Sequence, residues 1–507
     1  MSLKKLLLLC FLSGILLVLS FPPFNLTIFV WVGLVPLLIA IEGLKPKNAF
    51  ILSYLTGIVF FWGLLHWLIH VTLLGQALLV LYLGLYFGIF GLIVSKCQKN
   101  LTKGTSYSLL STLYPLLWIP SLWVMLEWLR GRAFTGFGWG ILGYSQYLFL
   151  PIVQIADITG VYGISFLIVM VNVTIYKIIR EVRLKNYTWL ISPILFASLC
   201  LCSTLIYGYI RLAREPTHKR VRIAVVQGNI SQQLKWDPEV THLILAKYSK
   251  LTRLAAVDGP DLIIWPETSC PGWLGKEPWL MDQLAGLARK INTPILVGSP
   301  FWDSEKTLSF NSAILISRNG KIISRYDKLH LVPFGEYTPR YFNFAARIDE
   351  RLEGGRFNPG HRYTQFRVAG ARFGVLICFE DIFPELARRF VRDGANLMVN
   401  ITNDAWFGET GAPYQHAQAS ALRAVENRIP VVRCANTGLS CFIEPNGRII
   451  SRVMDEEGRD IFITGFLTRD VSLGERPTIY TRFGDWFVYL CILISIGSGI
   501  GFFLTKD

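Results

Sequence analysis

The sequence predicts a multi-pass α-helical membrane protein with an inserted α/β domain, and two observations point to this class. The 507-residue chain is 52% hydrophobic and 13% aromatic, which is more than a soluble protein usually carries. Long apolar runs fill residues 6–209 and return at 484–504, whereas residues 217–480 are hydrophilic and alternate strand patterns with amphipathic helical patterns. Membrane helices on both sides of one layered domain account for this order.

Eight apolar stretches are long enough, or nearly so, to cross a bilayer core, which needs about 20 helical residues. We predict membrane helices at 6–21, 26–42, 49–71, 77–95, 107–128, 160–176 and 188–209, within a membrane domain over residues 1–212, and an eighth at 484–504. Lysine and arginine gather in alternate loops, which favours the cytoplasm for those loops. Both termini are therefore expected in the cytoplasm and the domain at 217–480 on the extracytoplasmic side.

Charge and cysteine usage exclude several other classes. The net charge is +15, but the basic residues are spread over short loops instead of forming one patch, so we predict no nucleic-acid partner. The nine cysteines contain no C-x-x-C pair, and His66 and His70 lack a third ligand, so we predict no metal and no cofactor. A disulfide among Cys270, Cys434 and Cys441 stays open at this point.

The hydrophilic segment reads as a layered α/β domain of about 260 residues. Strand patterns lie at 221–227, 262–265, 294–298, 311–317, 321–325, 373–377, 396–401, 430–434, 440–443 and 461–466. Helical patterns lie at 238–257, 278–291, 384–394 and 414–428. Strands and helices alternate early, and strands dominate later.

Three of these strand patterns lead to a residue that can do chemistry. Cys378 directly follows one strand, Glu267 follows a second, and Lys328 follows a third. A lone cysteine at a strand end is usually a small buried hydrophobe. A base and a cation at two other strand ends favour a nucleophilic site instead, although Glu267 and Lys328 taken alone could form a structural ion pair.

The three side chains suggest acyl transfer through a thioester. A thiol needs a neighbouring base at neutral pH, and Glu267 is the candidate. Lys328, with a backbone N–H near Phe379, would stabilise the oxyanion, where losing one donor typically costs about 3 kcal/mol of barrier. Glu336 and Glu380 are either supporting groups that hold Lys328 or surface carboxylates.

Two further stretches carry candidate binding residues. Asn403 to Gly408 follows a strand and resembles an active-site rim, which makes Asn403 and Trp406 candidates for substrate binding, with an ordinary Asn-Asp turn as the alternative. Residues 135–144 contain an accidental G-x-G-x-x-G, because no strand-to-helix unit with an acidic residue follows. This loop, with Trp139, is expected at the membrane interface, where aromatic residues are favoured.

The motifs WPET at 265–268, YDKLHLVPFGEY at 326–337 and GVLICFED at 374–381 resemble those of the nitrilase superfamily. The resemblance implies an αββα sandwich with a Glu-Lys-Cys triad at Glu267, Lys328 and Cys378. Phe379 stands where tyrosine is expected to be commoner in the family.

The chain as a whole resembles the apolipoprotein N-acyltransferase family. LEWLRG at 126–131, GYSQ at 143–146, VQGNI at 226–230 with Lys235-Trp236 after it, and NDAWFG at 403–408 extend the match over most of the length. Glu336, Glu380, Trp139 and Trp236 match family positions associated with the site.

That resemblance implies a ping-pong reaction. A phospholipid acylates Cys378, and the α-amino group of the N-terminal diacylglyceryl-cysteine of an apolipoprotein accepts the acyl chain. It also implies a monomer in the bacterial inner membrane with a periplasmic catalytic domain. Two alternatives stay open: a membrane-tethered nitrilase or amidase that passes its thioester to water, and a lipid or solute transporter with a degenerate domain.

Overall fold

The computed structural model describes residues 1–101, 109–187, 190–214, 219–338, 357–474 and 477–504, without the side chains of residues 98–101, 109–112, 236, 238 and 498–504. The chain divides into two compact units. One comprises Met1–Arg214 with Phe483–Asp507, and the other comprises Glu215–Arg482. The limits predicted at 107, 188 and 217 fall outside the described residues.

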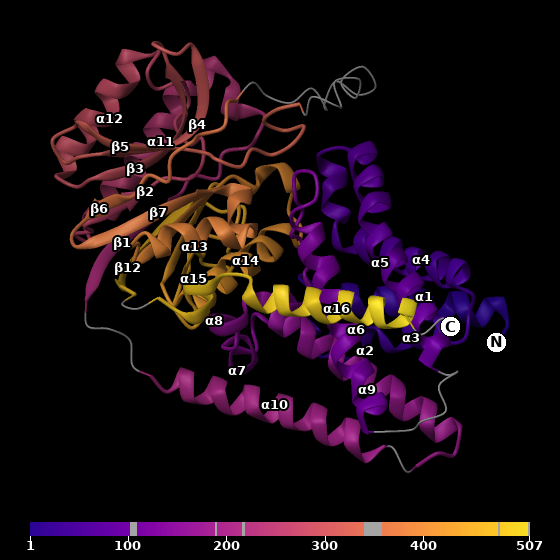
Figure 1. Cartoon of the computed structure of the whole chain (residues 1–507). Helices are drawn as coiled ribbons and strands as arrows, with labels where there is room; N and C mark the ends of the chain where they lie inside the picture. The colour runs from indigo at the N-terminus through magenta and orange to yellow at the C-terminus, as the bar shows by residue number, and fades with distance from the viewer. Residues whose placement is uncertain (102–108, 188–189, 215–218, 339–356, 475–476, 505–507) are drawn as a thin grey trace. The chain divides into compact units, whose positions relative to one another are not determined.

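The first unit is helical (Figure 1). Its elements are α1 (Leu3–Leu19), η1 (Thr27–Phe29), α2 (Val30–Gly33), α3 (Val35–Ile41), α4 (Pro46–Leu64), η2 (His66–His70), α5 (Leu73–Leu101), α6 (Leu109–Arg130), η3 (Leu142–Gln146), α7 (Leu150–Val153), α8 (Ala156–Thr159), α9 (Val161–Arg183), α10 (Ile191–Leu212) and α16 (Trp486–Leu504). Within the described residues, α4, Leu73–Cys97 of α5, α9 and α10 are long and apolar enough to cross a membrane. The eight-span topology stays a prediction.

Small residues let α4 and α5 pack closely. A Cβ added at Gly88 would lie 2.7 Å from the Phe50 ring, and one at Gly91 would lie 1.9 Å from the hydroxyl of Ser53. Such close approach is typical of helices that associate in a bilayer, because burial of apolar surface provides no hydrophobic driving force there. On α10, Ile191, Leu195 and Leu199 are exposed along one face.

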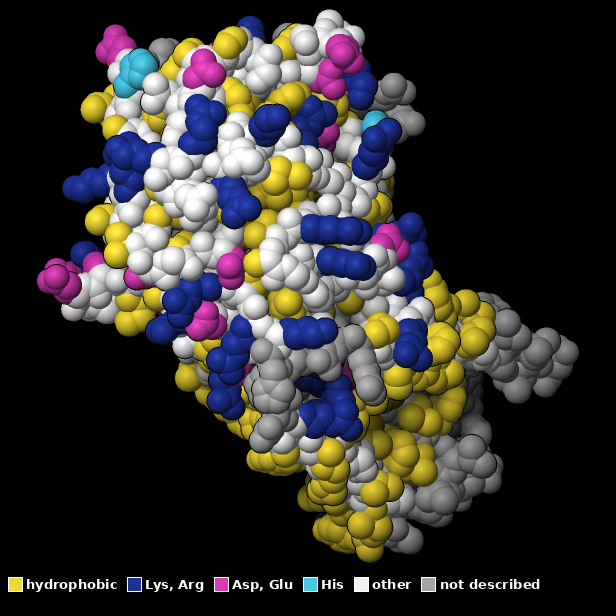
Figure 2. Space-filling view, turned by 90° about the vertical axis from the view of Figure 1, so that its left-hand side faces the viewer, with side chains coloured by type: hydrophobic (Ala, Val, Ile, Leu, Met, Phe, Trp, Pro, Cys, Tyr) yellow, Lys and Arg dark blue, Asp and Glu magenta, His cyan; other side chains and the backbone are white. Residues whose placement is uncertain are grey.

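The surfaces of the two units differ in kind. Figure 2 shows hydrophobic side chains gathered over the helical unit, whereas basic and acidic side chains are spread over the α/β unit. An apolar outer surface suits helices that face lipid. This surface and the four long apolar helices make the chain a membrane protein.

The second unit contains two six-stranded sheets. The first has the order β12 (Gly465–Ser472), β1 (Arg220–Gln227), β2 (Leu262–Ile264), β3 (Ile295–Asp303), β4 (Leu308–Ile316), β5 (Ile322–Asp327). The second has the order β11 (Ile449–Arg452), β10 (Cys441–Ile443), β9 (Val431–Ala435), β8 (Leu397–Thr402), β7 (Ala371–Ile377), β6 (Phe366–Val368). In each sheet three parallel strands, β1 to β3 and β7 to β9, form the centre, and antiparallel strands flank them.

Helices cover the outer face of each sheet. Against the first sheet lie α11 (Thr241–Ala256) and α12 (Pro278–Ile291), and against the second lie α13 (Pro384–Arg392) and α14 (Ala412–Asn427). The inner faces meet, since the Cys434 thiol on β9 lies 3.2 Å from the carbonyl oxygen of Ile264 on β2. This confirms the predicted αββα sandwich.

Two details differ from the sequence prediction. The last strand runs over Gly465–Ser472 instead of 461–466, and the short edge strands β6 and β11 were not predicted. Edge strands carry a weak apolar pattern because one side lacks a neighbour. Cys270, Cys434 and Cys441 are free buried thiols, so no disulfide links them.

Gly298 on β3 gives a test of how the sandwich supports the loop that follows β2. A Cβ there would lie 2.1 Å from the carbonyl oxygen of Pro266 and 2.7 Å from the Cα of Glu267, both backbone atoms that cannot rotate away. We expect Gly298→Ala to lower the free energy of unfolding by about 1–3 kcal/mol through overpacking. Thermal unfolding of the detergent-solubilised protein measures this as a lower Tm.

Gly286→Ala is the matched control. Gly286 lies inside α12, and a Cβ there would meet nothing within 4 Å. Alanine is the better helix former by about 0.5–1 kcal/mol, so this variant should melt at the same temperature or higher. Equal Tm values for the two variants would contradict the close approach at Gly298.

Candidate active site

Glu267, Lys328 and Cys378 meet because each follows a strand that ends at the same side of the sandwich. Glu267 follows β2, Lys328 follows β5, and Cys378 follows β7. The Lys328 ammonium lies 3.4 Å from Oε1 of Glu267, and the charges of both residues act on the Cys378 thiol. All three are buried, with exposed fractions of 6%, 1% and 9%.

The Glu267 carboxylate is held from both sides. Its Oε1 accepts a hydrogen bond of 2.8 Å from the side-chain amide of Asn311, and its Oε2 accepts one of 3.0 Å from the backbone N–H of Asn403. Asn311 lies on β4, and Asn403 directly follows β8. Both sheets therefore fix the orientation of this carboxylate.

Lys328 lies between two carboxylates. Its ammonium is 2.9 Å from Oε2 of Glu336, besides the contact with Glu267. Burial acts to lower the pKa of Lys328, but the charges of Glu336 and Glu267 outweigh it and hold the pKa well above its ordinary value. The lysine is thus a permanent cation at neutral pH.

Cys378 sits at a sharp turn from β7 into η9 (Cys378–Ile382). Its φ is +53°, a left-handed value that non-glycine residues rarely adopt. Side chains of Asn400 and His416 lie 3.1 and 3.2 Å from its carbonyl oxygen and hold this peptide. Burial and the Glu267 charge raise the pKa of the thiol, against the opposing effect of Lys328, so the resting group is a neutral thiol.

The two supporting carboxylates act at different points. Glu336 contacts the Lys328 ammonium directly, whereas Glu380 binds the backbone that follows it. The Glu380 carboxylate accepts the N–H groups of Leu329 and His330 and the hydroxyl of Tyr326. Burial raises the pKa of Glu380 to about 7, although the N–H of Ile377, the charge of Lys328 and the hydrogen bonds from His330 and Tyr326 oppose it.

The remaining predicted residues are distributed more widely. Phe379 is half-buried, with its ring centroid 6.0 Å from that of His330. Asn403 contributes its backbone N–H to Glu267, and Trp406 is exposed. Trp236 ends η4 (Leu234–Trp236), and its side chain lies outside the described residues.

Trp139 belongs to the helical unit, where it is buried against Trp67 with 5.1 Å between ring centroids. The predicted loop around it is tied to α6. Arg130 donates to the carbonyl oxygens of Phe137 and Trp139, and Glu127 accepts the N–H of Leu142.

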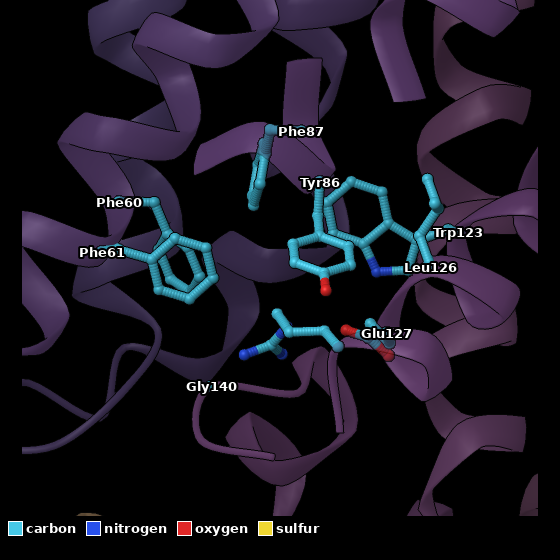
Figure 3. Close-up of a pocket in the computed structure, with 9 residues that line it drawn as sticks. Phe60, Phe61, Tyr86, Phe87, Trp123, Leu126, Glu127 and Gly140 are labelled. Carbon is cyan, nitrogen blue, oxygen red and sulfur yellow. The ribbon is translucent and has the colours of Figure 1, made fainter. Parts of the chain in front are cut away.

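Glu127 and Arg130 also line a small pocket in the helical unit, with rings from α4, α5 and α6 grouped around it (Figure 3). The guanidinium carbon of Arg130 lies 5.2 Å from the centre of the Phe61 ring. The Arg130 guanidinium therefore lies among these aromatic rings. Arg130 and Glu127 each hydrogen-bond the backbone of the loop at 135–144.

A network of buried charged side chains holds the backbone at Cys378. His416 on α14 lies 2.9 Å from Asp381 and 3.0 Å from Asp404, and Arg433 on β9 lies 3.1 Å from each of the same carboxylates. Burial and the Arg433 charge act to lower the pKa of His416, but Asp381 and Asp404 outweigh them and raise it to about 9. In contrast, Arg433 and His416 lower the pKa of Asp404 to about 2 against its burial.

Sequence reasoning did not predict Asn311, Lys235 or His416 as site residues, although Lys235 was part of the motif match. Asn311 is a polar residue inside an otherwise apolar strand pattern, which is a usable signal. Lys235 comes after the first strand, as Glu267 comes after the second. His416 lies on a helix 38 residues after Cys378, and its role depends entirely on how that helix packs.

The His416 network predicts a pH-dependent stability. Because the folded pKa of about 9 exceeds the unfolded value of about 6.5, the stabilisation is complete below pH 6.5 and is lost as the pH rises through 9. The loss should be on the order of 3 kcal/mol. We expect the Tm of the wild type to fall between pH 6.5 and 9, and His416→Gln to show a smaller fall.

His361→Gln provides the control, because His361 is an exposed histidine of the same unit. This variant should keep the wild-type dependence of Tm on pH. If His416→Gln keeps it as well, His416 is not the group responsible.

Comparison with known proteins gives the family. A family model for carbon-nitrogen hydrolases matches residues 222–472, and one for the apolipoprotein N-acyltransferase N-terminal domain matches residues 13–174. A solved amidase from Nesterenkonia sp. is 20% identical, with a TM-score of 0.40, and the match covers 55% of this chain and 98% of the amidase.

Two curated relatives match almost the whole length. The apolipoprotein N-acyltransferase of Geobacter metallireducens is 40% identical over 498 residues, which covers 95% of this chain and 92% of the relative. That of Chlorobaculum tepidum is 31% identical over 520 residues, with 96% and 94% covered. The chain therefore belongs to the apolipoprotein N-acyltransferase family, as the sequence motifs predicted.

Proposed function

We propose that this protein transfers an acyl chain from a membrane phospholipid, through a thioester on Cys378, to the α-amino group of a diacylglyceryl-cysteine at the N-terminus of an apolipoprotein. The observation that carries the proposal is the placement of a neutral buried thiol beside Glu267 and Lys328. Family membership supports the choice of donor and acceptor.

In the first half-reaction Glu267 takes the proton of the Cys378 thiol, and the thiolate attacks the carbonyl carbon of a phospholipid ester. Lys328 adds positive charge as the oxyanion forms. When the tetrahedral intermediate collapses, the lysophospholipid oxygen leaves and takes the proton from Glu267. The acyl chain stays on the sulfur as a thioester.

The second half-reaction uses the same groups in reverse. The acceptor amine attacks the thioester carbonyl and gives one proton to Glu267. The Cys378 thiolate then leaves and recovers that proton, and the product is an amide. Base and acid roles fall to one carboxylate, whose orientation Asn311 and Asn403 fix.

Location and assembly are part of the same proposal. We place the catalytic unit on the periplasmic side of the bacterial inner membrane and both termini in the cytoplasm, with eight membrane helices and a monomeric chain. The distribution of lysine and arginine among the predicted loops supports this orientation.

The donor step has a direct test. The purified protein is incubated with phosphatidylethanolamine vesicles, and its intact mass is measured. We expect an acyl adduct that hydroxylamine removes on the wild type and on Cys202→Ala, an exposed cysteine of α10, and none on Cys378→Ala. An adduct on Cys378→Ala would rule out Cys378 as the nucleophile.

The acceptor is tested by adding a diacylated lipopeptide and following lysophospholipid release. Release should stop after one turnover without the lipopeptide and continue with it. Steady turnover without any acceptor would mean transfer to water and would put the amidase alternative first.

The orientation predicts which side of the membrane can be labelled. Glu457→Cys introduces a thiol at a position whose side chain is 73% exposed. In spheroplasts, a membrane-impermeant maleimide should label this variant, and the parent protein sets the background. Labelling only after the membrane is permeabilised would contradict a periplasmic catalytic unit.

A further inference from the structure

Lys235 is a second lysine at the site that no mechanism step above employs. It lies in η4, which follows β1, so it reaches the strand-end side of the first sheet as Glu267 does. Its side chain is 5% exposed, and its ammonium donates a hydrogen bond of 3.0 Å to the main-chain carbonyl oxygen of Glu267.

The Lys235 ammonium has hydrogen-bonding capacity left over. An ammonium has three donors, and among the described residues the Glu267 carbonyl is the acceptor it uses. Within that part of the chain no carboxylate comes within 4.0 Å of it, although buried charges are normally paired. A buried ammonium whose N–H donors are not all used indicates that it binds another acceptor during the reaction.

Lys328, the other lysine of the site, is already paired with two carboxylates. The Lys328 ammonium lies 2.9 Å from Glu336 and 3.4 Å from Glu267, so these three groups carry a net charge of −1 when all are ionised. A thiolate or oxyanion at Cys378 would add further negative charge. Lys235 supplies the missing positive charge.

Lys235 is charged at neutral pH and lies in the field of the reacting group. Burial lowers the pKa of Lys235 to about 8, while the charges of Glu267 and Cys378 act to raise it. Asp404, which also acts on Cys378, is itself neutralised by Arg433 and His416.

We propose that Lys235 is a second catalytic lysine, and that its remaining N–H donors stabilise the negative charge that forms at Cys378 during acyl transfer. Lys328 keeps its role at the oxyanion, and Lys235 adds a second positive charge there. This role rests on the proposed function, since it concerns the same thioester chemistry.

The test compares Lys235→Met, which keeps the length but removes the charge, with Lys235→Arg, which keeps the charge. The rate of acyl-adduct formation from phosphatidylethanolamine is measured in a single turnover. We expect Lys235→Met to lose about 10²–10³-fold in rate with an unchanged or higher Tm, because it removes an unpaired buried cation. Lys235→Arg should recover part of the rate, and Lys290→Met, at an exposed position of α12, should match the wild type.

A second measurement does not depend on the acyl donor. Alkylation of Cys378 by iodoacetamide, followed by mass spectrometry across pH, reports the thiolate fraction. Lys235→Met should shift this profile to higher pH, with Glu267, Glu336, Lys328 and Asp404 unchanged around the thiol. Failure of the wild type to form an acyl adduct would defeat the proposed function, yet this shift would still establish the influence of Lys235.

Two results would overturn the inference. One is a Lys235→Met variant that acylates and alkylates as the wild type does. The other is a rate loss that follows a loss of folded protein, with a lower Tm and an unshifted alkylation profile, which would make Lys235 a structural residue of the Glu267 loop.

Discussion

The ammonium of Lys328 between two carboxylates is the interaction on which the rest of the catalytic unit depends. Glu267 and Glu336 approach the same buried cation, and Asn311 donates to both. Each charge alone would be costly inside the sandwich, and each is tolerable only with the others in place. The strands that bring them together therefore cannot shift independently of the site.

The backbone at Cys378 is tightly held, whereas the pKa of its thiol is not lowered. Cys378 is held in a left-handed turn, and Asn400 and His416 secure its carbonyl oxygen. Burial and the charge of Glu267 favour the neutral thiol. In the proposed mechanism, Glu267 therefore has to remove the thiol proton once a substrate is bound. A thiol that stays neutral between turnovers is also less exposed to oxidation.

The helical unit explains why this chemistry belongs to a membrane protein. Four long apolar helices and a largely apolar surface keep the chain in the bilayer, where an acyl donor with two hydrocarbon chains resides. Within that unit Glu127 and Arg130 hold the loop that carries Trp139. These hydrogen bonds give both buried side chains partners in the backbone of the loop.

The membrane class, the layered domain and the three strand-end residues could be predicted from the sequence, because apolar periodicity and strand ends are local properties. Only the folded chain shows which carboxylate holds Lys328, and only there do Asn311, Lys235 and His416 lie at the site. The edge strands β6 and β11 also came only from the structure. Glu267 and Asn403 are 136 residues apart, so their contact depends on the order and facing of two sheets, which no local pattern encodes.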